Sequence, residues 1–125
     1  MFEGLRDTRF KFGLNHGDLS VKNVRVDSVD KIYLIDWGSA EANIVPHFDF
    51  VEIVQSSLES SSIEFKKFLE GYGMHYREFK KIESEIEKLM LLRALDKLRW
   101  SLERKPGKVK HFITNTQKIL QRKII

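Results

Sequence analysis

The sequence predicts an α+β fold that is mainly α: a helical bundle with one small β-hairpin. Apolar residues recur at helical spacing through most of the chain after Pro46, which predicts amphipathic helices. Two short runs, 23–26 and 32–35, flank the polar turn 27–31 and predict the hairpin. The chain has 125 residues, 42% of them hydrophobic and 32% charged. These values are ordinary for one folded domain, which we expect to span residues 1–125.

The chain before the hairpin gives a weaker signal. Residues 1–14 are compatible with a frayed helix or an extended lead-in, and Lys11 has no strand-like setting. In the hairpin, side chains alternate between the two faces of each strand. We therefore expect Val24 and Val26 to pack with Ile32 and Leu34 on one face.

The segment after the hairpin is expected to be a loop, over residues 38–41, and then a helix. Pro46 indicates the helix start and puts Asp49 in the first turn, where a carboxylate favours the positive end of the helix. Ser61 and Glu64 fit a capping box, which places the start of another helix near Ser62.

A long helix from about Tyr76 to Leu102 is the expected spine of the domain, because apolar residues keep helical spacing along it. The residues Lys105-Pro106-Gly107 break this helix. Val109 to Leu120 then outline a last helix.

The composition excludes several classes of protein. No apolar run approaches the ~18 residues that a membrane helix requires, and the amino terminus is too charged for the apolar region of a secretory signal. The chain has no cysteine, which excludes disulfides and thiolate chemistry. The expected location is cytoplasmic, with no membrane partner.

The residues that suggest chemistry lie in two short stretches, 16–23 and 34–37. Asp18, Asn23 and Asp36 reproduce the spacing at which kinases place a catalytic Asp, an Asn and a metal-binding Asp. The attacking hydroxyl must be oriented and relieved of its proton, and Mg²⁺ needs hard oxygen ligands. An Asp together with an Asn/Asp pair supplies both.

These motifs resemble one family in particular. His-Gly-Asp-Leu-x-x-x-Asn at 16–23, followed by Ile-Asp-Trp at 35–37, is less like the eukaryotic protein kinases and resembles the aminoglycoside phosphotransferase and choline kinase family. Residues 46–50 are similar to that family's Gly-Asp-Pro-x-Tyr-Asp-Leu segment. Asp49 matches its second Asp, while Val45 stands where its first Asp would be. Residues 91–100 also look like a late helix of the family.

The resemblance implies a kinase-like carboxy-terminal lobe and an ATP-dependent transfer of the γ-phosphoryl group to a hydroxyl of a small molecule. It implies that Asp18 is the catalytic base and that His16 braces its loop. It also implies that Asn23 and Asp36 hold Mg²⁺ and with it the nucleotide, and that Asp49 supports the loop through hydrogen bonds. Trp37 is expected to pack in the core.

A kinase also needs a glycine-rich loop and a strand Lys over the phosphates, and only 15 residues precede His16. We therefore expect the catalytic lobe alone, with the amino-terminal nucleotide lobe absent. Three explanations stay open: the chain is a fragment of such an enzyme, the product of a split or truncated gene, or a subunit whose nucleotide lobe comes from a separate chain or from self-association. The identity of the substrate stays open.

Two other functions remain as alternatives. The chain could be an inactive, kinase-like regulatory module that kept the lobe and lost turnover. It could also be a basic nucleic-acid-binding domain, because no Asp or Glu follows Arg104, the formal net charge is +4 and the pI is near 9.3. The absence of a known binding motif makes nucleic acid the weaker alternative.

Overall fold

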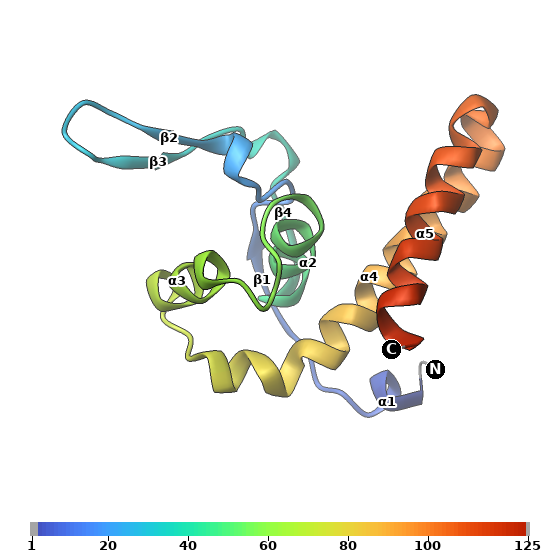
Figure 1. Cartoon of the computed structure of the whole chain (residues 1–125), viewed down its shortest axis with the longest axis horizontal. Coiled ribbons are helices and arrows are strands. Elements are labelled where there is room, and N and C mark those ends of the chain that lie inside the picture. The colour runs from blue at the N-terminus through green and yellow to red at the C-terminus, as the bar shows by residue number, and fades with distance from the viewer. Residues whose placement is uncertain (1–2, 125) are drawn as a thin grey trace. The chain divides into compact units, whose positions relative to one another are not determined.

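The computed structural model describes residues 3–124, with side chains described as far as Gln121. The chain is mainly helical and has two small antiparallel sheets of two strands each, so a second sheet joins the single hairpin expected from the sequence (Figure 1). The elements in chain order are α1 (Glu3–Arg6), β1 (Lys11–Asn15), η1 (Val21–Asn23), β2 (Val24–Val26), β3 (Ile32–Leu34), η2 (Trp37–Ser39), β4 (Glu41–Val45), α2 (His47–Ser56), α3 (Ile63–Tyr72), α4 (Tyr76–Arg104), η3 (Pro106–Lys108) and α5 (Val109–Ile124).

The contacts within the chain divide it into two compact units, residues 1–86 and residues 87–125. We call them the sheet unit and the basic unit. The sheet unit contains both sheets, α2, α3 and the first turns of α4, and the basic unit contains the rest of α4 and α5. The single domain expected over 1–125 stays a prediction.

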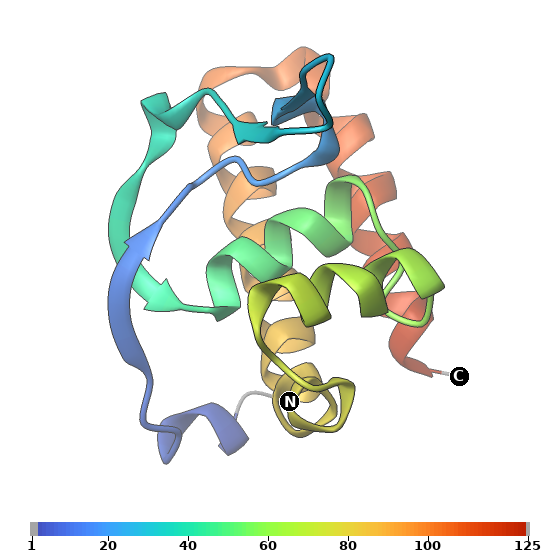
Figure 2. The same ribbon diagram turned by 90° about the vertical axis from the view of Figure 1, so that its left-hand side faces the viewer.

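The sheet of β1 and β4 was not expected from the sequence. Lys11 begins β1 and pairs with Val45, so the expectation that it has no strand-like setting is wrong. The apolar side chains of β1, Phe12 and Leu14, are 74% and 70% exposed. The strand therefore lacks the usual pattern of buried apolar residues, and its partner lies some thirty residues further along the chain (Figure 2). Residues 38–41 are likewise not one loop, because β4 begins at Glu41.

The hairpin of β2 and β3 has the expected pairing, with Val24 opposite Leu34 and Val26 opposite Ile32. Its apolar residues face solvent, since Val26 is 58% and Ile32 70% exposed. The turn is organised by Asp27, whose carboxylate accepts hydrogen bonds from backbone N–H groups in the turn. These bonds hold the pKa of Asp27 below its ordinary value.

An aromatic core holds α2, α3 and the first turns of α4 together within the sheet unit. Phe50, Phe65 and Phe79 are at most 1% exposed. The ring centroids of Phe65 and Phe79 are 4.7 Å apart, and those of Phe50 and Phe65 are 6.4 Å apart. Full burial of each such ring contributes about 1.5–3 kcal/mol. This core fixes α2, which carries Asp49.

The ends of α3 and α4 follow the sequence closely. The capping residue of α3 is Ser62, whose Oγ accepts a hydrogen bond from Phe65 N at 3.1 Å, so the expected cap at Ser61 is wrong by one residue. Gly73 ends α3 in the left-handed conformation. The long helix begins at Tyr76 as predicted and ends at Arg104, two residues beyond the predicted end.

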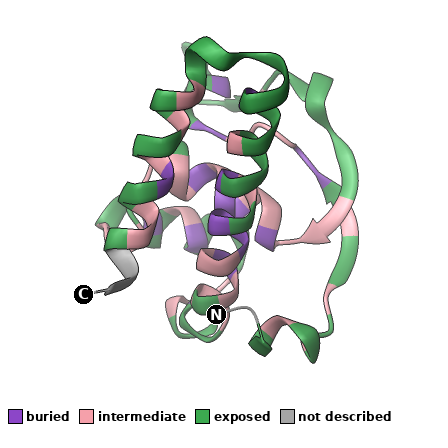
Figure 3. Ribbon diagram, turned by 90° about the vertical axis from the view of Figure 1, so that its right-hand side faces the viewer, coloured by how far each residue is buried: buried purple, intermediate pink, exposed green. Residues whose placement is uncertain are grey.

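In the basic unit, α5 returns along the later part of α4 after the η3 turn (Figures 2 and 3). Ser101 on α4 and Thr116 on α5 are buried, and each hydroxyl donates to a carbonyl of its own helix. Small side chains that satisfy their own polar groups let helices approach closely. Within residues 3–124, no helix combines the length and the apolar character needed to cross a membrane.

Candidate functional site

The site is built on residues 16–23, which we call the catalytic loop after the kinase motif that they resemble; it leads from the end of β1 to η1. The loop is anchored from α2 by Asp49. The Asp49 carboxylate accepts a hydrogen bond from His16 N at 2.9 Å and another from Gly17 N at 3.2 Å. Hydrogen bonds to a charged acceptor are about twice as strong as neutral ones. These two hydrogen bonds have the form of the support that the resemblance implies for Asp49.

Gly17 brings the catalytic loop against η2. Its backbone has φ +84°, and a Cβ at this position would collide with the carbonyl oxygen of Ser39. Only glycine fits both the left-handed conformation and the close approach. Gly17 belongs to the His-Gly-Asp motif as the glycine that a tight loop needs, and these two constraints show why no other residue fits there.

His16 joins the catalytic loop to the segment that carries Asp36. The ring is 2% exposed; its Nε2 lies 2.9 Å from Ile35 O and its Nδ1 accepts from Asp18 N at 3.3 Å. A ring that accepts at Nδ1 and faces a carbonyl at Nε2 carries its proton on Nε2, an assignment made from the hydrogen-bond network. His16 thus braces the loop through both nitrogens.

Trp37 packs against the outer face of this brace rather than in the core. Its ring centroid is 4.6 Å from that of His16, its Nε1 donates to Leu34 O at 2.9 Å, and it is 48% exposed. The expectation of a core tryptophan is therefore wrong. The indole instead covers the buried imidazole.

The Asp18 carboxylate is held by two neighbours on η1. Asn23 Nδ2 donates to Asp18 O at 2.8 Å and to Asp18 Oδ2 at 3.1 Å, and Lys22 Nζ lies 3.0 Å from the same Oδ2. Lys22 is the largest cause of a lowered pKa of Asp18; burial opposes it by raising the pKa, and the hydrogen bond from Asn23 lowers the pKa further by a smaller amount. Asp18 is therefore charged at neutral pH, and its side chain is 35% exposed.

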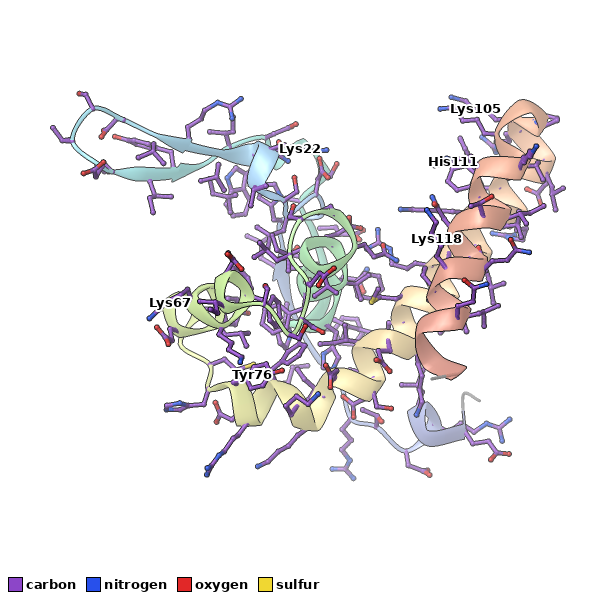
Figure 4. All side chains as sticks on the ribbon, viewed as in Figure 1. Lys22, Lys67, Tyr76, Lys105, His111 and Lys118 are labelled. Carbon is purple, nitrogen blue, oxygen red and sulfur yellow. The ribbon has the colours of Figure 1, made fainter. Side chains whose placement is uncertain are left out.

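Lys22 is a site residue that the sequence analysis missed. It lies four residues after Asp18 and is 67% exposed at the base of the hairpin (Figure 4). A spacing of four brings side chains together whenever the backbone makes a helical turn. A prediction of the helical turn η1 from the sequence would therefore have identified the ion pair of Asp18 and Lys22.

Asp36 turns the chain out of the hairpin and into η2. Ile35 N donates to Asn23 O at 2.9 Å, which places Asn23 and Asp36 at the same end of the hairpin. Asp36 has φ 62° and ψ 61°, a left-handed conformation that Asp tolerates better than most residues. Its side chain is exposed, and among residues 3–124 the structure assigns no hydrogen bond to its carboxylate.

Asn23 and Asp36 carry oxygen atoms of the kind that Mg²⁺ takes as ligands. Both Nδ2 bonds of Asn23 go to Asp18, so its Oδ1 stays an acceptor, and Asp36 adds a carboxylate. Over residues 3–124 no three His, Cys, Asp or Glu side chains gather into a metal-binding group. Mg²⁺ does not require one, because it keeps several waters and relies on substrate phosphates for the rest of its shell.

Comparisons of the chain with protein-family models, with curated proteins and with solved structures find no match. The functional interpretation rests on the residues and geometry of this chain. Asp49, His16 and Gly17 hold the catalytic loop in place, while Asp18, Asn23 and Asp36 present oxygen atoms near one end of the hairpin.

Proposed function

We propose that the catalytic loop belongs to a phosphotransferase of the aminoglycoside phosphotransferase and choline kinase type, which moves the γ-phosphoryl group of ATP to a hydroxyl of a small molecule. The observation that carries the proposal is the setting of Asp18. Its carboxylate is charged and partly exposed, and it is fixed on a loop whose backbone is anchored by Asp49 and braced by His16. A turn-forming Asp does not need this support.

The chemistry assigned to Asp18 follows from its charge. A carboxylate with a lowered pKa is too weak a base to ionise a free hydroxyl. It can accept a hydrogen bond from the hydroxyl, aim the oxygen at the phosphorus, and take the proton as the new O–P bond forms. The transition state of phosphoryl transfer is loose, so little deprotonation is needed before that point. Orientation is the main contribution that Asp18 makes.

Asn23 Oδ1 and the Asp36 carboxylate are the groups assigned to hold Mg²⁺. When bound, Mg²⁺ with ATP supplies the phosphoryl group and neutralises charge on the phosphates. Asn23 would link the two functions, since its Nδ2 fixes Asp18 while its Oδ1 serves the metal. Glycine-rich cover for the phosphates is assigned to an amino-terminal lobe, which residues 1–15 do not supply.

The proposal is tested on the chain assembled with a nucleotide lobe, with a panel of amino alcohols and aminoglycosides as acceptors. Asp18→Asn should lower kcat by about 10²–10⁴ and change KM little, because the lost interaction belongs to the transition state. Asp36→Asn should raise the Mg²⁺ concentration needed for activity. Asp30→Asn is the matched control, since Asp30 is also exposed and also has a positive φ, of 60°.

Near-normal kcat in Asp18→Asn would refute the assignment of the base. An assembled, folded protein that transfers no phosphoryl group to any acceptor would refute the enzyme and favour the regulatory module.

A second test uses the ion pair and needs no turnover. Lys22→Met should raise the pKa of Asp18 toward its ordinary value, because Lys22 is the largest cause of the depression. A depressed folded pKa stabilises the protein above the ordinary pKa, and this is lost as the pH falls through the folded pKa. The variant should therefore show a smaller loss of stability on acidification. NMR titration of the Asp18 carboxyl carbon measures the pKa, with Lys31→Met as control.

An Asp18 titration that Lys22→Met leaves unchanged would show that the pair is not formed in solution. In the active assembly, the same variant should move the acidic limb of the pH–rate profile to higher pH.

A further inference from the structure

The charge of the chain is divided unevenly between its two compact units. The basic unit, residues 87–125, has eleven Lys and Arg against three Asp and Glu, a formal charge of +8. The sheet unit, residues 1–86, has eleven against fifteen, a formal charge of −4. The net charge of +4 therefore hides a strongly cationic unit. Such asymmetry points to an anionic partner for that unit.

The cations of the basic unit concentrate where there is no acid. No Asp or Glu follows Glu103 in the sequence. Among the residues whose side chains the structure describes, the lysines of η3 and α5 and the lysine before η3 are all exposed. Lys105 Nζ lies 5.5 Å from the centre of the Trp100 ring, a contact that leaves its charge facing solvent. These lysines are Lys105, Lys108, Lys110 and Lys118.

One face of α5 is polar along its whole described length. Its members recur at spacings of three, four and seven residues, which places them on one side of a helix. All are exposed, and none is acidic or aliphatic. Figure 4 shows Lys105, His111 and Lys118 on the same side of this part of the chain. We call this surface the outer face of α5: Lys110, His111, Thr114, Gln117, Lys118 and Gln121.

The chemistry of the outer face selects among anionic partners. A membrane surface is bound by helices that insert several apolar side chains beside their lysines. Among the described side chains of α5, the exposed large apolar one is Ile113, which is 40% exposed and does not belong to the outer face. Single-stranded nucleic acid is bound on a series of aromatic platforms. The outer face carries one ring, the imidazole of His111, and the Trp100 ring beside Lys105 lies on α4. Lys, Thr and Gln side chains are the usual donors to phosphate oxygens of a duplex, and a helix fits its major groove.

We propose that the outer face of α5, together with Lys105 and Lys108, binds the phosphate backbone of duplex DNA. The binding is electrostatic and independent of sequence. It is separate from the phosphotransferase proposal, because it uses residues of the basic unit alone.

The salt dependence of binding follows from the number of lysines. Four lysine–phosphate contacts predict that log K falls with log salt at a slope of about −3.6. The affinity should therefore fall by roughly 10²-fold between about 50 and 200 mM salt. Each contact removed should reduce the slope by about 0.9.

The experiment measures fluorescence anisotropy of a short, mixed-sequence DNA duplex with the full chain over this range of salt. The double variant Lys110→Gln, Lys118→Gln should reduce the slope by about 2. The control is Lys66→Gln, Lys67→Gln on α3, which changes the net charge equally at exposed positions of the other unit. It should leave the slope unchanged. Circular dichroism melts check that both variants fold like the parent.

Three results would overturn the proposal. The first is a failure of the parent chain to bind the duplex at about 50 mM salt, where lysine–phosphate contacts are strong. The second is a control variant that reduces the slope as much as the α5 variant, which would mean that binding depends on net charge alone. The third is tighter binding of the chain to vesicles of anionic lipid, or to the matching single strand, than to the duplex.

Discussion

Removal of the Asp49 carboxylate separates two roles that the sequence leaves equally open. Asp49 lies in the first turn of α2, where any acid favours the positive end of the helix, and it also accepts the N–H groups of His16 and Gly17. A helix-terminal acid contributes about 0.3–1 kcal/mol. A loop anchor contributes more, because its loss leaves two backbone donors without their acceptor.

The size of the second effect can be worked from the structure. A buried donor left unsatisfied costs about 1–3 kcal/mol. His16 is buried while Gly17 and Asp49 are half-buried, so water can replace part of what is lost. Asp49→Ala should therefore cost about 2–4 kcal/mol in total. Asp49→Asn keeps one acceptor oxygen and should cost less.

Hydrogen exchange resolves where the cost falls. In Asp49→Ala, the protection factors of the His16 and Gly17 amides should fall by roughly 30- to 1,000-fold. This range is the loss of about 2–4 kcal/mol converted into a change in the equilibrium constant for local opening. Urea unfolding gives the global value. Glu59→Ala, which removes an exposed carboxylate outside the helices, is the control and should change neither. A loss of 1 kcal/mol or less in Asp49→Ala, with both amides still protected, would refute the anchor and leave a helix-terminal acid.

Two further predictions compare matched pairs by thermal unfolding. Gly17 and Gly73 have φ of +84° and +85°, but only Gly17 is closely approached, by Ser39. Gly73→Ala should lower the stability by about 1–2 kcal/mol through backbone strain. Gly17→Ala should lower it clearly more and disturb the loop. Equal losses of stability would contradict the close approach of Ser39 to Gly17. Ser62→Ala should cost about 1 kcal/mol by removing the cap of α3, and Ser61→Ala almost nothing. The reverse order would restore the cap expected from the sequence.

The parts of the fold that local patterns specify were predictable. Apolar spacing predicted α4 to within two residues at its end, and the two short runs predicted the hairpin and its pairing. The sheet of β1 and β4 was missed because its pairing is long-range and because Phe12 and Leu14 lie on its exposed side. Burial patterns cannot reveal a strand whose apolar residues face outward.

The candidate site divides in the same way. The motif carries the spacing of Asp18, Asn23 and Asp36, and a sequence shows spacing directly. The hydrogen bonds that hold the loop cannot be read from the sequence, because each joins residues far apart in the chain. His16 and Asp49 are 33 positions apart, and His16 and Ile35 are 19 positions apart. The position of Trp37 was wrong for a related reason: the ring that it contacts belongs to His16, far away in the sequence, and the sequence does not show that contact.

The division of labour among the polar groups argues for chemistry rather than for a turn alone. His16, Asn23 and Asp49 use their donors and acceptors to hold the loop, and His16 and Asn23 are buried in doing so. A polar loop that served only structure would satisfy its remaining carboxylates in the same way, as Asp27 does in the hairpin turn. Asp18 instead receives both Asn23 and Lys22 on Oδ2, so among the described residues its Oδ1 accepts no hydrogen bond, and the exposed carboxylate of Asp36 accepts none either. These are the two carboxylates that the proposed transfer uses.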